Sequence, residues 1–215
     1  MRGDRDVNAD ALPAALVLLA SGAPEASAEA SGDETRRDVL ACQRGEREAF
    51  DRLVERHQRA VYRLCYRYVN DHQDASDLAQ DVFLKAYRAI GRFRGDSSFS
   101  TWLYRIAVNT CLNFRSARRP DREELPESLP DGRPAPPERL EAAERARRVR
   151  EAVASLPERQ RATLILKIYH ELTHEEVAGV LGSSVGTVKA NLFHALANLK
   201  KKLDQPGAAA RLARG

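Results

Sequence analysis

The chain has 215 residues, of which 43% are hydrophobic and 31% are charged, and its formal net charge is +4. This composition is ordinary for a helix-rich protein of one domain or two small ones, and its mildly basic balance allows an anionic partner without requiring one. The apolar run at residues 11–20 is too short to cross a bilayer and follows three aspartates, so neither a membrane span nor a secretory signal is expected.

Three cysteines lie far apart in the chain and form no C-x-x-C pair: Cys42, Cys65 and Cys111. An odd number of cysteines without metal-binding spacing indicates free thiols in a reducing compartment, so we expect a cytoplasmic protein. A targeting role for residues 1–30 is the minor alternative. Buried structural thiols are favoured over a redox sensor, because reactive cysteines need an exposed, electropositive setting.

The first residues and the segment after them differ in pattern. Residues 1–33 are rich in Ala, Ser, Gly and Asp, which predicts a disordered tail. Residues 34–119 then show helical periodicity, with apolar residues at steps of three and four in two successive segments. A third helix is expected from Thr101 to beyond Phe114. Together these segments predict an N-terminal helical bundle.

The composition changes again at residue 120. Six of the chain's ten prolines lie in residues 120–137, among many acidic residues, and proline removes the backbone donors that regular structure needs. This stretch predicts a flexible acidic linker. Helical periodicity resumes over residues 138–204, and a flexible tail is expected at 205–215. The fold class is therefore all-α: two small helical domains, the N-terminal bundle and a C-terminal helix-turn-helix domain, joined by a flexible Pro-rich linker.

The C-terminal segment carries the clearest local signal. Thr173 and Glu176 have the spacing of a capping box, and Gly182 is suited to end the helix that they begin. Ser184 is placed to cap a second helix. Two short helices joined through a glycine predict a helix-turn-helix, whose second helix reads the DNA major groove. A plain helical hairpin is the alternative. Core positions are expected at Val188, Leu192, Ala195, Leu199 and Leu203.

The sequence "HELTH" at residues 170–174 matches the zinc-protease pattern H-E-x-x-H. That chemistry needs both histidines on one continuous helix. Thr173 is expected to cap a new helix, which places His170 and His174 on either side of a break. We therefore expect both histidines to face solvent, and a metal hydrolase is the weakest of the functional hypotheses.

Charge is distributed unevenly along the N-terminal bundle. Asp74, Asp77 and Asp81 share one helix face, with Gln80 beside them. Residues 88–119 instead carry seven arginines against a single acid, Asp96. One edge of the domain thus favours a cationic protein partner and the other favours nucleic acid, although a merely solvated acidic face is the alternative.

Two blocks, residues 74–113 and 156–199, resemble the two characteristic blocks of extracytoplasmic-function (ECF) sigma factors of the sigma-E-like kind, within the sigma-70 family. They occur in the family's order on either side of a Pro-rich linker. The resemblance implies a protein that binds core RNA polymerase, recognises the −35 and −10 promoter elements and melts the −10 region. It implies no catalysis by the chain itself, no metal or other cofactor, no stable membrane insertion, and an anti-sigma factor as a further partner.

The resemblance also assigns roles to particular positions. Contacts to core polymerase would fall on Asp77, Gln80, Asp81 and Phe83. Contacts to the −10 element would fall on Arg94, Ser98, Phe99, Ser100, Trp102, Tyr104 and Asn109, with Asn109 helping to hold a flipped-out base. Contacts to the −35 element would fall on Ser184, Val185, Thr187, Lys189, Ala190, Phe193 and His194.

Some of these assignments stay open. Phe99, Trp102 and Tyr104 follow helical spacing, so core packing is as well supported for them as DNA contact. Many relatives have Arg where this chain has His194, and the loss of Arg weakens phosphate and guanine contacts. The promoter sequence is therefore not transferable. A stand-alone regulator that binds duplex DNA through the helix-turn-helix alone is the main alternative function.

Overall fold

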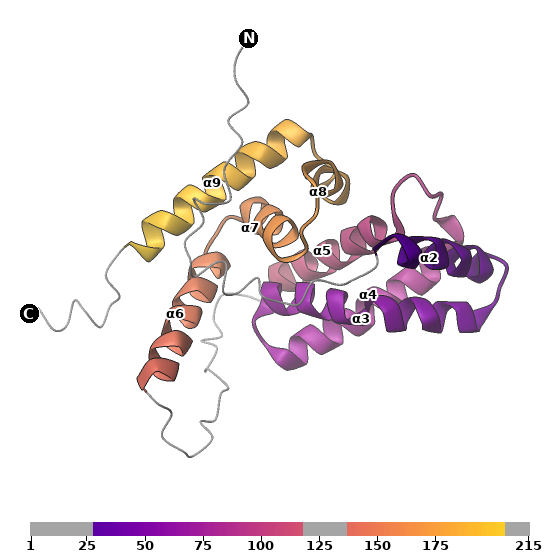
Figure 1. Ribbon diagram of the computed structural model, residues 1–215, viewed down its shortest axis with the longest axis horizontal. Helices are drawn as coiled ribbons and strands as arrows, with labels where there is room; N and C mark the ends of the chain where they lie inside the picture. The colour runs from indigo at the N-terminus through magenta and orange to yellow at the C-terminus, as the bar shows by residue number, and fades with distance from the viewer. Residues whose placement is uncertain (1–27, 118–136, 205–215) are drawn as a thin grey trace, which may run out of the picture.

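The computed structural model describes residues 28–117 and 137–204, and within these two ranges every regular element is a helix and no strand occurs (Figure 1). The prediction of an all-α fold is confirmed. Among the helices described, none is both long and apolar enough to cross a membrane.

The N-terminal domain consists of α2 (Ala28–Gln43), α3 (Arg47–Val69), α4 (His72–Ala89), a 3₁₀ turn (Ile90–Arg92) and α5 (Phe99–Ala117). The sharp reversal between α3 and α4 has a local cause. Asn70 ends α3 in the left-handed conformation, with φ of 56°. Asp71 then caps α4, because its side chain accepts a hydrogen bond from the Asp74 backbone N–H.

The C-terminal domain consists of α6 (Pro137–Ala154), α7 (Glu158–Leu164), a π-helical turn (Ile165–Tyr169), α8 (His174–Leu181) and α9 (Val185–Leu203). The predicted cap, turn and second cap are confirmed. Thr173 and Glu176 form a complete capping box, Gly182 is left-handed with φ of 58°, and Ser184 accepts a hydrogen bond from the Thr187 N–H. The expected core face of α9 is also confirmed, with Leu203 half-buried and the other four positions buried.

The boundary predicted for the N-terminal tail was wrong at its end. Helix α2 begins at Ala28, inside the stretch of residues 1–33 that was expected to be disordered. Two ion pairs at the buried Asp38 fix this helix to α3: Asp38 is bound by the exposed Arg52 at 2.7 Å and by Arg56 at 3.1 Å. Burial raises the pKa of Asp38, but the hydrogen bonds and charges of the two arginines outweigh burial and leave the pKa lowered. The rest of the tail, most of the linker and the C-terminal tail lie outside the described residues.

The burial of the cysteines agrees with the prediction of structural thiols rather than a redox sensor. All three are free, Cys65 and Cys111 are fully buried, and Cys42 is half-buried. The neighbouring Cys65 thiol and burial both raise the pKa of Cys111, and burial raises the pKa of Cys42. The Cys111 and Cys42 thiols are therefore protonated, which is the opposite of a reactive thiolate.

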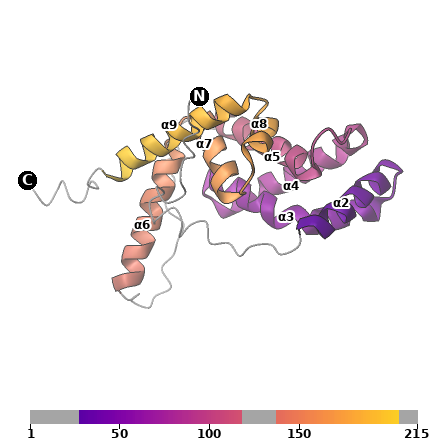
Figure 2. The same ribbon diagram turned by 45° about the horizontal axis from the view of Figure 1, so that its top comes forward.

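The two domains pack against each other, with α8 lying beside α5 (Figures 1 and 2). Val177 and Ala178 of α8 belong to the same buried cluster as Leu103 and Ala107 of α5. The sequence predicted two domains on a tether but not this contact.

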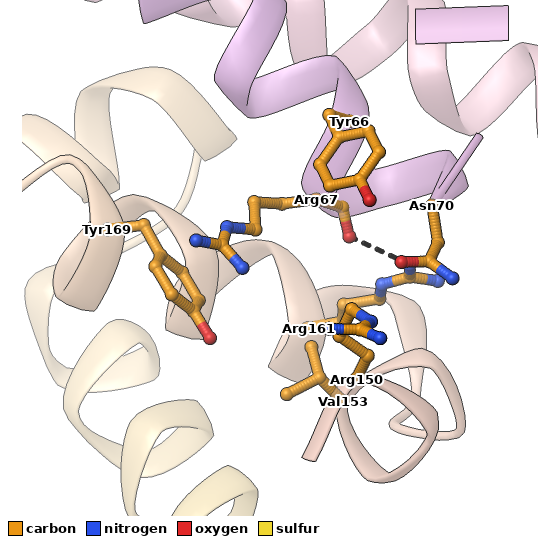
Figure 3. Close-up of a pocket in the computed structure, with 7 residues that line it drawn as sticks. All are labelled: Tyr66, Arg67, Asn70, Arg150, Val153, Arg161 and Tyr169. Carbon is orange, nitrogen blue, oxygen red and sulfur yellow. Dashed lines mark hydrogen bonds between the residues drawn. The ribbon is translucent and has the colours of Figure 1, made fainter. Parts of the chain in front are cut away.

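Arginine side chains join the domains at a second place, where α7 meets the end of α3 (Figure 3). Arg161 of α7 is 2% exposed and donates hydrogen bonds to the backbone carbonyls of Arg67 and Tyr68 in the last turn of α3. The guanidinium of Arg67 in turn lies 4.2 Å from the centre of the Tyr169 ring. A small cavity of about 20 Å³ remains between these groups, enough for a single water molecule.

Candidate functional site

A groove between α3 and α4 brings together two of the residues expected to contact polymerase. It has a volume of about 450 Å³ and includes Gln80 and Phe83. Asp77 and Asp81 are exposed on the same helix. The opposite wall of the groove was not predicted from the sequence: α3 supplies it with Val54, Gln58, Arg59 and Tyr62. Helical periodicity predicts an apolar stripe along this segment, but periodicity alone does not show that a stripe borders an open groove.

The loop before α5 has a structural explanation for its small residues. Gly95 adopts a left-handed conformation with φ of 78°, which favours glycine. The Ser98 hydroxyl accepts a hydrogen bond from the Thr101 N–H at 3.1 Å and so begins α5. Arg94 and Ser98 are exposed, and Ser100 is half-buried. The loop thus presents a positive charge and a hydroxyl beside the start of the helix.

The aromatic residues of this region form one cluster. The Trp102 ring lies 5.2 Å from that of Phe93 and 5.6 Å from that of Phe99, measured between ring centres. Phe99 is 5% exposed, whereas Trp102 is half-buried. Phe99 is therefore a core residue, and Trp102 combines core packing with an accessible part of its ring, which a base can contact.

Tyr104 and Asn109 lie apart in this structure. Tyr104 is 8% exposed and packs against His170 of the C-terminal domain, with 4.9 Å between ring centres. Asn109 is exposed on α5. Trp102 and Asn109 are seven residues apart, two turns of helix, and so lie along the same side of α5. The structure brings Trp102 and Asn109 onto one side and places Tyr104 at the domain junction instead.

Helix α9 exposes the residues expected to read duplex DNA. Lys189, Ala190 and His194 are exposed, and Phe193 is 63% exposed although it is a large apolar residue. Thr187 is exposed near the start of the helix, where Ser184 acts as the cap and Val185 is half-buried. Because recognition helices contact base edges with residues in their N-terminal half, this face has the geometry of a major-groove reader.

The helix is interrupted within the "HELTH" segment, as expected, but one of its two histidines does not face solvent. His170 follows the π-helical turn and His174 begins α8, so the two do not share a helix. The prediction that His170 faces solvent was wrong, because its ring packs against Tyr104 and its Nε2 is buried. Burial, with Arg63 and Arg67 nearby, lowers the pKa of His170 to about 4. No group of residues able to hold a metal ion occurs in the part of the chain that the structure describes.

Comparisons with known proteins match both domains. The model "Sigma-70 region 2" matches residues 53–120, and the model "Sigma-70, region 4" matches residues 146–199. The chain is 41% identical over 177 residues to the RNA polymerase sigma-H factor of Pseudomonas aeruginosa, which covers 77% of this chain and 91% of the relative. It is 40% identical over 176 residues to the ECF RNA polymerase sigma-E factor of Escherichia coli K12, which covers 77% of this chain and 92% of the relative.

A solved structure is similar over both domains. The structure of CnrH in complex with the cytosolic domain of CnrY has a TM-score of 0.62 and 27% sequence identity, and the match covers 80% of this chain and 97% of that one. Both family models match in the expected order along the chain, and the two relatives are 40–41% identical to it over 77% of its length. These matches identify the family. This chain belongs to the ECF sigma factors of the sigma-70 family.

Proposed function

We propose that this sigma factor binds core RNA polymerase through the groove between α3 and α4, reads the −35 element with α9, and opens the −10 element with the loop at residues 94–100 and helix α5. The observation that carries the proposal is the exposure of three chemically distinct surfaces in one chain. They are a groove with apolar lining on a helix that also exposes two aspartates, an arginine-rich segment with an exposed amide, and a capped recognition helix with an exposed polar face.

The groove suits a basic protein helix. Asp77 and Asp81 are exposed on α4, next in sequence to groove-lining residues, and the half-buried Phe83 supplies apolar surface inside the groove. Charged residues at an edge guide association, while a buried aromatic supplies most of the binding energy. Binding of the polymerase in this groove would hold the sigma factor on the enzyme and leave the surface of α9 free to bind DNA.

Strand opening needs a source of free energy other than nucleotide hydrolysis. Separating base pairs costs about 1.4 kcal/mol per step, and stacking one base on an aromatic side chain returns about 1–3 kcal/mol. The accessible part of Trp102 offers such a surface, and the exposed Asn109 offers both a donor and an acceptor to a base edge. Arg94 and other arginines of residues 88–119 would hold the phosphates.

The chain would act in the cytoplasm, with the polymerase, and would carry out no covalent chemistry of its own. An anti-sigma factor is a natural further partner, since the exposed groove and α9 would otherwise remain available when transcription is not required. The similar protein CnrH is found in complex with the cytosolic domain of CnrY, which supports this part of the proposal.

Run-off transcription with core polymerase tests the proposal. The purified chain and core enzyme should give promoter-specific RNA, with thymines of the −10 region reactive to permanganate, whereas neither protein alone should do so. Specific DNA binding without core polymerase and without any gain in transcription would instead identify a stand-alone regulator.

A further inference from the structure

Helix α8 packs on the part of α5 that precedes Asn109. A Cβ placed on Gly179 of α8 would lie 3.5 Å from Cγ2 of Thr101, so the two helices approach to van der Waals contact. Thr101 and Arg105 are one turn apart on α5, and Asn109 follows after one more turn. Helix α8 therefore contacts α5 at Thr101 and at Arg105, which lies one helical turn before the proposed strand-binding residue Asn109.

Arg105 connects the two helices. Its Nε donates a hydrogen bond to the Gly179 carbonyl oxygen at 3.2 Å, and its Nη2 donates to the same oxygen. Gly179 lies in the last turn of α8, where carbonyls lack partners within the helix and the helix dipole is negative. An anionic phosphate oxygen offers a guanidinium the same kind of acceptor with a full charge. Arg105 is otherwise exposed, so a phosphate reaches it once α8 has moved.

A second contact of the same kind holds the domains from the other side. Arg161 of the C-terminal domain donates to carbonyls in the last turn of α3, just as Arg105 of the N-terminal domain donates to the last turn of α8. Each domain thus supplies one arginine to a helix end of the other. The groove between α3 and α4 lies outside both contacts, and so do the exposed residues of α9.

We propose that α8 and the −10 DNA strand compete for the same side of α5, and that Arg105 transfers its hydrogen bonds from the Gly179 carbonyl to a DNA phosphate when the domains separate. The inference rests on the proposed function and adds a DNA contact and an order of events to it. The docked protein binds polymerase through the open groove, and it opens DNA only after α8 has left α5.

A reversible cross-link between the two helices tests the inference in the full chain. In a disulfide each sulfur lies about 3 Å from the Cβ of the other cysteine, and the distance between the Gly179 position and Thr101 Cγ2 is close to this. The double variant Thr101→Cys, Gly179→Cys should cross-link in the free, oxidised protein. The single variants Thr101→Cys and Gly179→Cys are the matched controls, because they cannot form the bridge.

The oxidised double variant should still bind core polymerase, but permanganate reactivity of the −10 thymines should fall by more than about tenfold and return on reduction. Oxidised protein that opens the promoter as well as reduced protein would overturn the inference, and so would failure of the cross-link to form. If the wild-type chain with core polymerase opens no promoter, the proposed function itself fails.

The phosphate contact of Arg105 has its own readout. For the chain with core polymerase, Arg105→Ala should lower the salt dependence of −10 DNA binding by about one unit of slope. The matched control is Arg47→Ala, at an exposed position at the start of α3, which should leave the slope unchanged. An unchanged slope for Arg105→Ala would show that Arg105 only holds the two domains together. It would contradict the proposal that Arg105 moves from the Gly179 carbonyl to a DNA phosphate.

Discussion

Helices α9 and α5 are both proposed to contact DNA, but the fold leaves their surfaces open to different degrees. On α9, Lys189 and Phe193 of the N-terminal half are exposed and only the opposite face is buried. On α5, Tyr104 is buried at the domain junction and Arg105 is bound to α8, while Asn109 remains exposed. The recognition helix is thus ready to read duplex DNA, whereas the strand-opening helix is partly covered by the other domain.

The difference follows from where each helix packs. Helix α9 contacts α6, α7 and α8 of its own domain. Helix α5 packs against α3 and α4 of its own domain and also against α8 of the other. A change that undocks the domains should therefore alter α5 and leave α9 as it is, and the following experiments test that distinction.

The largest effect is expected from Arg161→Ala. The substitution leaves the Arg67 and Tyr68 carbonyls without their donor at a buried site, which should lower the free energy of unfolding by roughly 3–5 kcal/mol. Urea denaturation measures the change. Arg159→Ala, at an exposed position of the same helix, is the matched control and should change stability by less than about 0.5 kcal/mol. Equal effects of the two substitutions would show that the buried arginine does not hold the domains.

A smaller effect is expected from protonation of His170. Its pKa is lowered to about 4 from the ordinary value of 6.5, so the folded protein binds fewer protons than the unfolded chain between these values. The stabilisation is complete above pH 6.5, is lost as the pH falls toward 4, and amounts to at most about 3 kcal/mol.

Urea denaturation of wild type and His170→Gln between pH 7 and pH 4 checks this expectation. The variant should show a flatter dependence of stability on pH, and the loss in wild type should coincide with separation of α8 from α5. His174→Gln is the comparison variant, because His174 is a half-buried histidine at the start of α8 whose pKa is also lowered, mainly by burial. Identical pH profiles of wild type and His170→Gln would show that protonation of His170 does not destabilise the domain junction.

The contrast between the helices also shows what sequence reasoning could reach. The boundaries of α8 and α9 follow from Thr173, Gly182 and Ser184, whose capping and left-handed conformations are local properties. The exposed face of α9 follows from its apolar stripe in the same way. Capping and periodicity were sufficient to predict the exposed face of α9, because this helix packs against the core of its own domain.

The junction could not be reached by the same route. Arg105 and Gly179 are 74 residues apart, and nothing in the pattern of either segment pairs an arginine with a backbone carbonyl in another domain. His170 was expected to face solvent because a polar residue between two helices usually does, and contact with Tyr104 overrides that local expectation. Tyr104 was left open between core and DNA contact, and the same contact now places it at the junction.

Asn109→Ala should separate DNA opening from polymerase binding. The side chain is exposed and packs in no core, so stability should hold, while loss of a base-edge hydrogen bond should weaken promoter opening by about tenfold. Permanganate reactivity measures opening, and a polymerase-binding assay measures assembly. Asn113→Ala, at an exposed site one turn further along α5, is the matched control. If Asn109→Ala weakened both activities equally, the residue would be structural.

The smallest effect is expected from Lys189→Ala on α9. The side chain is exposed near the start of the recognition helix, so its removal should cost one phosphate contact and leave the fold unchanged. Binding of −35 duplex DNA, measured over a range of salt concentrations, should show a slope that is lower by about one unit. Lys200→Ala, in the last turn of α9, is the control for a change of charge alone. Because α9 is open whether or not the domains are docked, the Lys189 effect should be the same in wild type and in the cross-linked Thr101→Cys, Gly179→Cys protein. A Lys189 effect that disappeared on cross-linking would mean that docking covers both helices, and the contrast between α9 and α5 would not hold.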